Sequence, residues 1–169
     1  MSAGARRRGA PGTAALRAAL IAAAGVFGCA TACAQAALEP AAAIAGVDNP
    51  QRAWQHWTLN CQGCHRPDGH GSPGAAPDIA GSVAKFLRVD GGREYLARVP
   101  GVATSPLSSR DLAEVLNWML WRFDAADIPA NFQPYTEPEL DRLRTAPLRT
   151  EASQLRRALL KKIGQAPAR

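Results

Sequence analysis

Cysteine and histidine are scarce in this chain, and their scarcity limits the kinds of site that it can form. Its 169 residues include four cysteines and three histidines. Cys29 and Cys33 lie in an apolar N-terminal segment, and no cysteine follows Cys64. A structural zinc site takes a full set of Cys and His ligands, usually from two pairs. Since only His65 and His70 follow Cys64, the second pair of a zinc finger is missing.

Strand patterns and a basic core are lacking as well. No stretch alternates apolar and polar residues for long, which argues against the βαβ setting of a thioredoxin-like dithiol. The net charge is +6, yet residues 35–140 carry 8 basic and 12 acidic groups, whereas residues 141–169 carry 8 basic and 2 acidic groups. The core is therefore acidic, and we expect it to have no nucleic-acid partner.

What the sequence does contain is Cys61-Gln62-Gly63-Cys64-His65, the attachment pattern of c-type haem. On a helical turn, sulfurs three residues apart face the same side, so both can form thioethers with the vinyl groups along one side of a porphyrin. His65 follows directly and is placed to bind the iron as the proximal ligand. We therefore predict one haem c, bound covalently through Cys61 and Cys64, with His65 as the metal ligand.

The N-terminus has the pattern of a secretory signal peptide. Four arginines without an acidic residue precede an alanine-rich run over residues 18–34, which is short and poor in bulk for a membrane span. Ala32-Cys33-Ala34 matches an A-x-A cleavage site. We expect residues 1–34 to be removed after Ala34 and the mature protein to lie in the periplasm. A loose lipobox makes a lipid-anchored form at Cys29 the alternative.

Helical patterns cover most of the chain after residue 48. Asn49-Pro50 predicts the start of a helix that runs to about Cys64. Ala53, Trp57 and Cys61 share one face of this helix. The absence of strand patterns predicts an all-α fold. Further helices are predicted over residues 82–87, 93–98, 108–123, 136–144 and 150–163.

Two spacings are typical of capping boxes, in which a hydroxyl and an acidic side chain three residues later accept hydrogen bonds from the unpaired backbone N–H groups at the start of a helix. One joins Ser108 to Asp111, and the other joins Thr136 to Glu139. Gly164 is expected to close the last helix. Residues 101–107 are expected to form a loop.

Another loop follows the haem motif. Residues 66–77 include three glycines and three prolines. A chain that passes close to a flat cofactor favours residues without bulk. Ile79, just beyond this loop, can pack on the porphyrin.

Together these residues resemble the class I cytochrome c domain over about residues 48–124. In that family the helix that carries the haem motif crosses a C-terminal helix, and Ala53, Trp57 and Trp118 match the small and aromatic residues of the crossing. The resemblance implies the class I cytochrome c fold around one haem. It also implies that the carbonyl of Pro77 accepts the other N–H of the axial histidine.

The sequence departs from this family in one respect. The family usually carries a second iron ligand, a methionine, in the loop before the last helix, but residues 99–107 contain neither Met nor His. Met119 is the one methionine after the leader, and it lies in an apolar helical stripe that favours packing over ligation. The sixth position stays open between Met119, water, no ligand, and a group from a partner or from the tail.

The motif and the resemblance predict a periplasmic monohaem cytochrome that carries single electrons between redox proteins, such as a dehydrogenase or an oxidase, and is not an enzyme. Two alternatives stay open. One is a five-coordinate haem protein that binds or activates a gas or peroxide, and the other is the haem relay subunit of a larger complex. Arg66, Arg93 and His70 are the candidates for distal acid–base groups, and nothing in the sequence positions them.

The chain thus divides into a leader, a loose lead-in over 35–47, a cytochrome c domain over 48–124, and a basic helical C-terminal extension over 125–169. The last predicted helix has an apolar side and a basic side. We interpret this extension as a solvated surface appendage. The alternative is a docking surface for an acidic partner or for an anionic membrane face. The basic residues concerned are Arg156, Arg157, Lys161 and Lys162.

Overall fold

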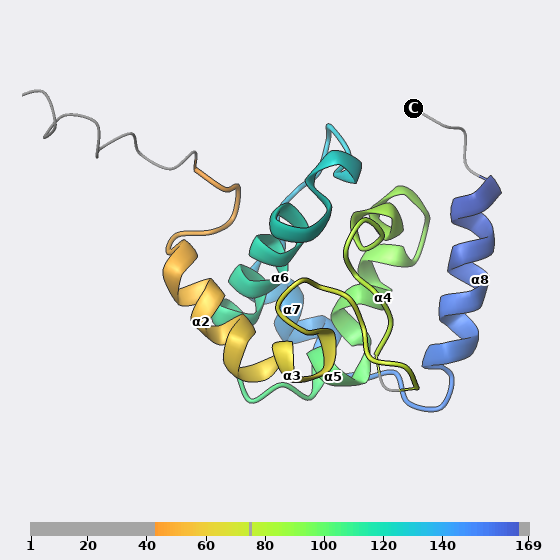
Figure 1. Ribbon diagram of the computed structural model, residues 1–169, viewed down its shortest axis with the longest axis horizontal. Coiled ribbons are helices and arrows are strands. Elements are labelled where there is room, and N and C mark those ends of the chain that lie inside the picture. Colours follow the sequence, from red (N-terminus) through yellow and green to blue (C-terminus); the bar gives the residue numbers. More distant parts are fainter. Residues whose placement is uncertain (1–42, 75, 166–169) are drawn as a thin grey trace, which may run out of the picture. The chain divides into compact units, whose positions relative to one another are not determined.

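Helices form nearly all of the regular structure in the computed structural model, which describes residues 43–74 and 76–165 (Figure 1). The only β pairing among these residues is an isolated bridge between Ser72 and Ala76. The predicted all-α class is therefore confirmed. The signal peptide, its cleavage site and Cys29 lie outside the described residues.

The helix that carries the haem motif is α2, Pro50–Asn60, and it begins where the sequence predicts. The Asn49 side chain accepts a hydrogen bond from the backbone N–H of Arg52 at 2.9 Å, and Pro50 takes the first helical position. The predicted single helix divides at Cys61, whose φ of −124° leaves the helical region. A separate turn, α3, then spans Gln62–His65.

Short helices fill the middle of the chain. They are η1, Ala84–Arg88, α4, Gly92–Arg98, and α5, Pro100–Ala103. The last of these corrects the loop predicted over 101–107, because Pro100, with its φ already suited to a helix, starts a turn. Gly92 must be glycine, since a Cβ there would collide with the carbonyl oxygen of Phe86.

The central helix is α6, Ser109–Asp124, which packs against α2. Its predicted cap is confirmed, because the Ser108 hydroxyl oxygen accepts from the backbone N–H of Asp111 at 3.1 Å and its O–H donates to the Asp111 carboxylate at 2.7 Å. Ala53 and Trp57 of α2 are buried. The buried apolar side chains of α6 include Leu112, Val115, Leu116, Met119 and Leu120.

The C-terminal part continues the same core instead of standing apart from it. After η2, Ala125–Asp127, come α7, Glu137–Arg144, and α8, Ala152–Gln165. Ala43–Arg169 form one compact unit. The appendage interpretation is wrong, because this part places large side chains in the core with at most 3 % of their surface exposed. These side chains are Tyr135, Leu140, Leu148 and Leu159.

Two finer predictions for this part are also wrong. Thr136 precedes α7, but its side chain makes no capping hydrogen bond. Gly164 lies within α8 and does not end it. Instead, the chain before α7 is held by Asn117 of α6, whose side chain bonds both the N–H and the carbonyl of Tyr135, at 2.8 and 3.0 Å. No helix in the described ranges has the length and apolar character needed to cross a membrane.

Candidate functional site

The two thiols and the imidazole lie within one turn of the chain, from Cys61, which caps α3, to His65. Cys61 ends α2, and Cys64 and His65 belong to α3. The backbone N–H groups of Cys64 and His65 both donate to the carbonyl of Cys61, each at 3.1 Å, which closes the turn. Cys61 and Cys64 form no disulfide; Cys61 is partly buried and Cys64 is exposed. A single turn therefore presents two sulfurs and an imidazole together.

The ring of His65 is oriented by a carbonyl on the following loop. Its Nδ1 lies 3.1 Å from the oxygen of Pro77. Because a carbonyl can only accept, Nδ1 carries the proton and Nε2 is left with a free lone pair. Burial lowers the pKa of His65, with the Pro77 bond opposing it, so the neutral imidazole that a metal requires is favoured.

The loop after the motif folds back on itself to bring Pro77 to His65. The Ser72 hydroxyl donates to the carbonyl of Cys64 at 3.0 Å, and the backbone N–H of Gly71 donates to the Asp78 carboxylate at 2.6 Å. Gly71 has no room for a side chain, because a Cβ would collide with the carbonyl oxygen of Ala76. Gly71 thus allows the loop to reverse tightly, whereas the predicted close approach of the loop to a cofactor stays a prediction.

Burial and the neighbouring Cys64 raise the pKa of Cys61 to about 11. A dithiol oxidoreductase needs a thiolate with a lowered pKa. Cys61 therefore lacks the electrostatics of such a nucleophile. The motif fits haem c, whose attachment uses two reduced thiols on one face and whose iron takes a neutral imidazole nitrogen.

Two curated proteins are similar to this chain. Cytochrome c-552 of Thermus thermophilus is 36% identical over 106 residues, which cover 52% of this chain and 81% of the relative. A second protein of the same name, from a further strain of Thermus thermophilus, is also 36% identical over 106 residues, covering 52% of this chain and 72% of the relative. The chain belongs to the class I c-type cytochromes. No family model and no solved structure matches it.

Haem binding, iron and electron transport follow from membership of this family. The cytochrome packs an aromatic cluster beside the imidazole. The Trp57 ring centroid lies 6.0 Å from those of His65 and Trp118, and 4.8 Å from that of Phe123. The sequence analysis did not single out Phe123 as a site residue. Its i+4 spacing from Met119 was the available signal.

Two predicted site features lie in the core. Ile79 is 8 % exposed, and its N–H donates to the carbonyl of Gly69 at 2.9 Å. Met119 is also 8 % exposed and belongs to the hydrophobic core cluster, in keeping with packing. Both side chains are thus shielded from solvent, as a dry cofactor environment requires. The roles of Cys61, Cys64 and His65 as haem-binding residues stay predictions.

The other two histidines each lie near a carboxylate. His56 Nε2 lies 3.9 Å from the Asp111 carboxylate, between α2 and α6. His70 is half exposed, and its Nδ1 lies 3.8 Å from the Asp78 carboxylate. Of the three histidines, His65 is the one that stands on the same turn as the thiol pair.

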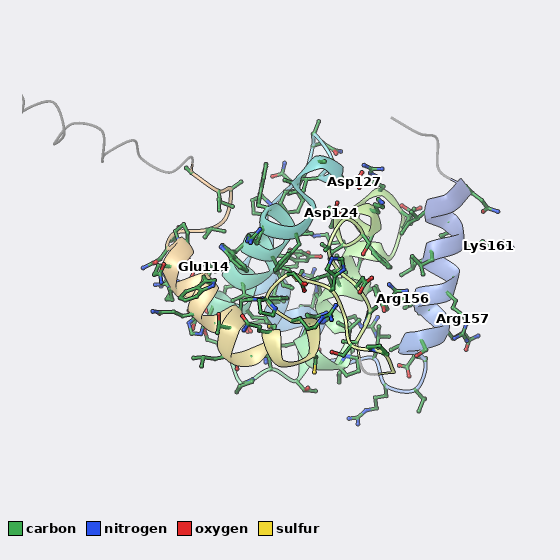
Figure 2. The ribbon with its side chains drawn as sticks, viewed as in Figure 1. Glu114, Asp124, Asp127, Arg156, Arg157 and Lys161 are labelled. Atoms are coloured by element: carbon green, nitrogen blue, oxygen red, sulfur yellow. The ribbon has the colours of Figure 1, made fainter. Side chains whose placement is uncertain are left out.

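Sequence reasoning also missed Glu114, which holds α2 on α6 (Figure 2). It is 5 % exposed, and its carboxylate accepts from the backbone N–H of Asn49 at 2.7 Å and from the Arg52 guanidinium at 2.9 and 2.8 Å. A buried carboxylate is tolerated only with such partners. The one sequence signal was an acidic residue inside an apolar stripe. Glu114 thus positions the helix that carries the motif.

Proposed function

We propose that this cytochrome is exported to the periplasm and carries single electrons between redox proteins, such as a dehydrogenase and an oxidase, without being an enzyme. The observation that carries the proposal is the turn that joins Cys61, Cys64 and His65, with the His65 ring held by Pro77. Haem c, when bound, supplies a one-electron iron couple.

The chain's own residues would hold and tune that group. Cys61 and Cys64 would hold the group through two thioethers, each thiol adding its S–H across one vinyl group so that nothing would be released. His65 would offer Nε2 to the iron, and the hydrogen bond from Nδ1 to Pro77 would fix the ring and make it a better donor. Buried apolar side chains exclude water, which disfavours the charged ferric state and raises the potential. We assign this role to Trp57, Ile79, Leu116 and Met119.

Two of the three candidate distal groups, Arg66 and Arg93, are held by bonds to other parts of the fold, which supports a carrier over an enzyme. Arg93 is ion-paired with Glu139 at 2.6 Å and donates to the carbonyl of Gln133 at 2.7 Å. Arg66 donates from Nε to the carbonyl of His70 at 3.2 Å. These bonds belong to the fold, and they leave little freedom for proton transfer to a ligand.

Mass spectrometry of the exported protein, made together with haem-maturation machinery, tests the proposal. We expect the mass of the mature chain plus one haem, a first residue of Gln35, and a reversible one-electron titration. The Cys61→Ala/Cys64→Ala variant should lose the covalent adduct. A bare chain mass with two thiols that alkylate would refute the proposal.

A second function is favoured by one observation, namely that residues 99–107 contain no Met or His while Met119 is packed in the core. An iron without a sixth protein ligand would bind a small ligand such as a gas or peroxide. Carbon monoxide separates the two functions. Rapid binding with a high-spin spectrum favours the open site, and a low-spin spectrum that changes in Met119→Leu favours a thioether ligand.

A further inference from the structure

Helix α8 uses its apolar side to attach to the core. Leu159 is 1 % exposed, and Leu155 and Ile163 are partly buried against the core cluster. The helix packs on η1 and α4. In Figure 1, α8 and α2 lie on opposite sides of α4 and α6. The outer side of α8 is therefore a fixed surface away from the helix that carries the haem motif.

Four cations and no acidic residue occur within Ala152–Gln165. Arg156 and Lys162 lie at the edges of the helix, since the Arg156 guanidinium carbon is 5.8 Å from the Phe86 ring centroid and Lys162 Nζ lies 3.4 Å from the carbonyl oxygen of Asp90. Arg157 and Lys161, one turn apart, are exposed and point outward (Figure 2). We call these four residues the α8 basic face.

Among the described residues, some cations are paired with carboxylates, and others, such as Arg142 and Arg149, are not. Arg52, Lys85, Arg88 and Arg93 each form an ion pair with an acidic side chain. In the described ranges, no residue of the α8 basic face does so. Like charges one turn apart repel and weaken a helix slightly. The repulsion between Arg157 and Lys161 therefore does not stabilise the helix.

We propose that the α8 basic face docks an acidic surface of a redox partner protein. The proposal rests on the electron-carrier function above. It adds a docking contact that leaves the side of the haem motif free for electron exchange. Complementary charge of this kind speeds encounter and fixes orientation. A membrane is disfavoured as the occupant, because helices that lie in lipid need a free apolar side, and here that side is buried in the core. Leu160, 38 % exposed, is the one large apolar side chain that α8 exposes.

The test uses the full haem-loaded protein and two variants with the same change in net charge. Arg157→Glu/Lys161→Glu alters the α8 basic face, and Arg110→Glu/Arg142→Glu alters exposed cations on α6 and α7. The probes are a synthetic helical peptide with glutamates along one side and, separately, phosphatidylglycerol vesicles. Amide chemical shifts and Kd are measured at low salt, where exposed charges are least screened.

We expect the peptide to shift amides of residues 152–165 and its Kd to weaken about tenfold or more in the α8 variant, against about threefold or less in the control pair. Equal weakening in both variants, or no binding to the wild type, would overturn the proposal. Vesicle binding that depends on α8 while peptide binding does not would overturn it in favour of a membrane. If the charge-reversal variant Arg157→Glu/Lys161→Glu does not fold, the neutral variant Arg157→Gln/Lys161→Gln replaces it.

Haem attachment separates this test from that of the proposed function. Every variant is first checked for the covalent haem mass and a reduced-minus-oxidised spectrum. If a variant keeps its covalent haem and its spectrum but no longer binds the peptide, the defect lies in the α8 basic face alone. A wild type without covalent haem would instead refute the electron-carrier function.

Discussion

At the scale of single residues, the site depends on backbone atoms as much as on the cysteines and the histidine. The carbonyl of Pro77 orients His65, and that carbonyl reaches the ring because residues 71–76 make a tight reversal. Gly71 makes this reversal sterically possible. The chemistry of the motif is therefore incomplete without a glycine six residues beyond it.

Two glycine substitutions near the motif test this dependence. In Gly71→Ala the new Cβ meets backbone, so we expect a loss of about 2 kcal/mol or more in the free energy of unfolding and a disturbed axial histidine signal. Gly63→Ala is the control, because nothing lies within 4 Å of its Cβ and the position is helical. Alanine there should be neutral or stabilise by up to about 1 kcal/mol. Urea unfolding and paramagnetic NMR measure both. If both variants changed the free energy of unfolding and the histidine signal equally, the tight reversal would not be what orients His65.

At the scale of elements, Glu114 should govern how α2 sits on α6. Glu114→Ala leaves the N–H of Asn49 and the Arg52 guanidinium without their partner, so we expect a loss of about 2–4 kcal/mol. Glu114→Gln keeps an acceptor oxygen and should cost less. The control is Asp141→Asn on the exposed side of α7. Urea unfolding gives the energies, and hydrogen exchange should localise the added opening to α2. Uniform exchange throughout the protein would contradict this.

The contact between α6 and η1 should make stability depend on pH. The Asp124 carboxylate accepts from the backbone N–H of Ala84 at 2.7 Å (Figure 2), and burial, together with the charge of Asp127, raises its pKa above the ordinary 3.8. The folded protein thus holds this proton more tightly than the unfolded chain. The resulting stability is complete below the unfolded pKa and is lost as the pH rises through the folded pKa.

Asp124→Asn cannot ionise, and its amide oxygen can still accept from Ala84. We therefore expect this variant to gain stability relative to the wild type as the pH rises from about 4 to 7. Urea unfolding at several pH values measures the difference. A difference that stays constant, or falls, over that interval would contradict the raised pKa.

The elements that could be predicted from the sequence are those with local signals. The starts of α2 and α6 are set by Asn49-Pro50 and Ser108, whose side-chain contacts lie within three residues. The haem motif is equally local. Glu114 could not be found, because its partner Asn49 is 65 residues away and only the folded chain shows that it is buried. The absent cap at Thr136 has a similar cause, since Asn117 already holds the neighbouring Tyr135.

At the scale of the whole molecule, the C-terminal helices are part of the core that surrounds the site. We therefore expect one cooperative unfolding transition, seen at the same urea concentration by haem absorbance and by far-UV circular dichroism. An appendage would instead unfold separately and leave the haem signal unchanged.

A pair of adjacent leucines in α8 tests this integration directly. Leu159 is 1 % exposed and belongs to the core cluster, whereas Leu160 is 38 % exposed. Leu159→Ala should lower the free energy of unfolding by about 2–5 kcal/mol, because it leaves a cavity against η1 and α4. Leu160→Ala removes the same atoms from a half-exposed place and should cost less than about 1 kcal/mol. In Leu159→Ala, the unfolding midpoints measured by haem absorbance and by circular dichroism should shift together. A shift in circular dichroism alone would mean that α8 unfolds independently of the haem-bearing core.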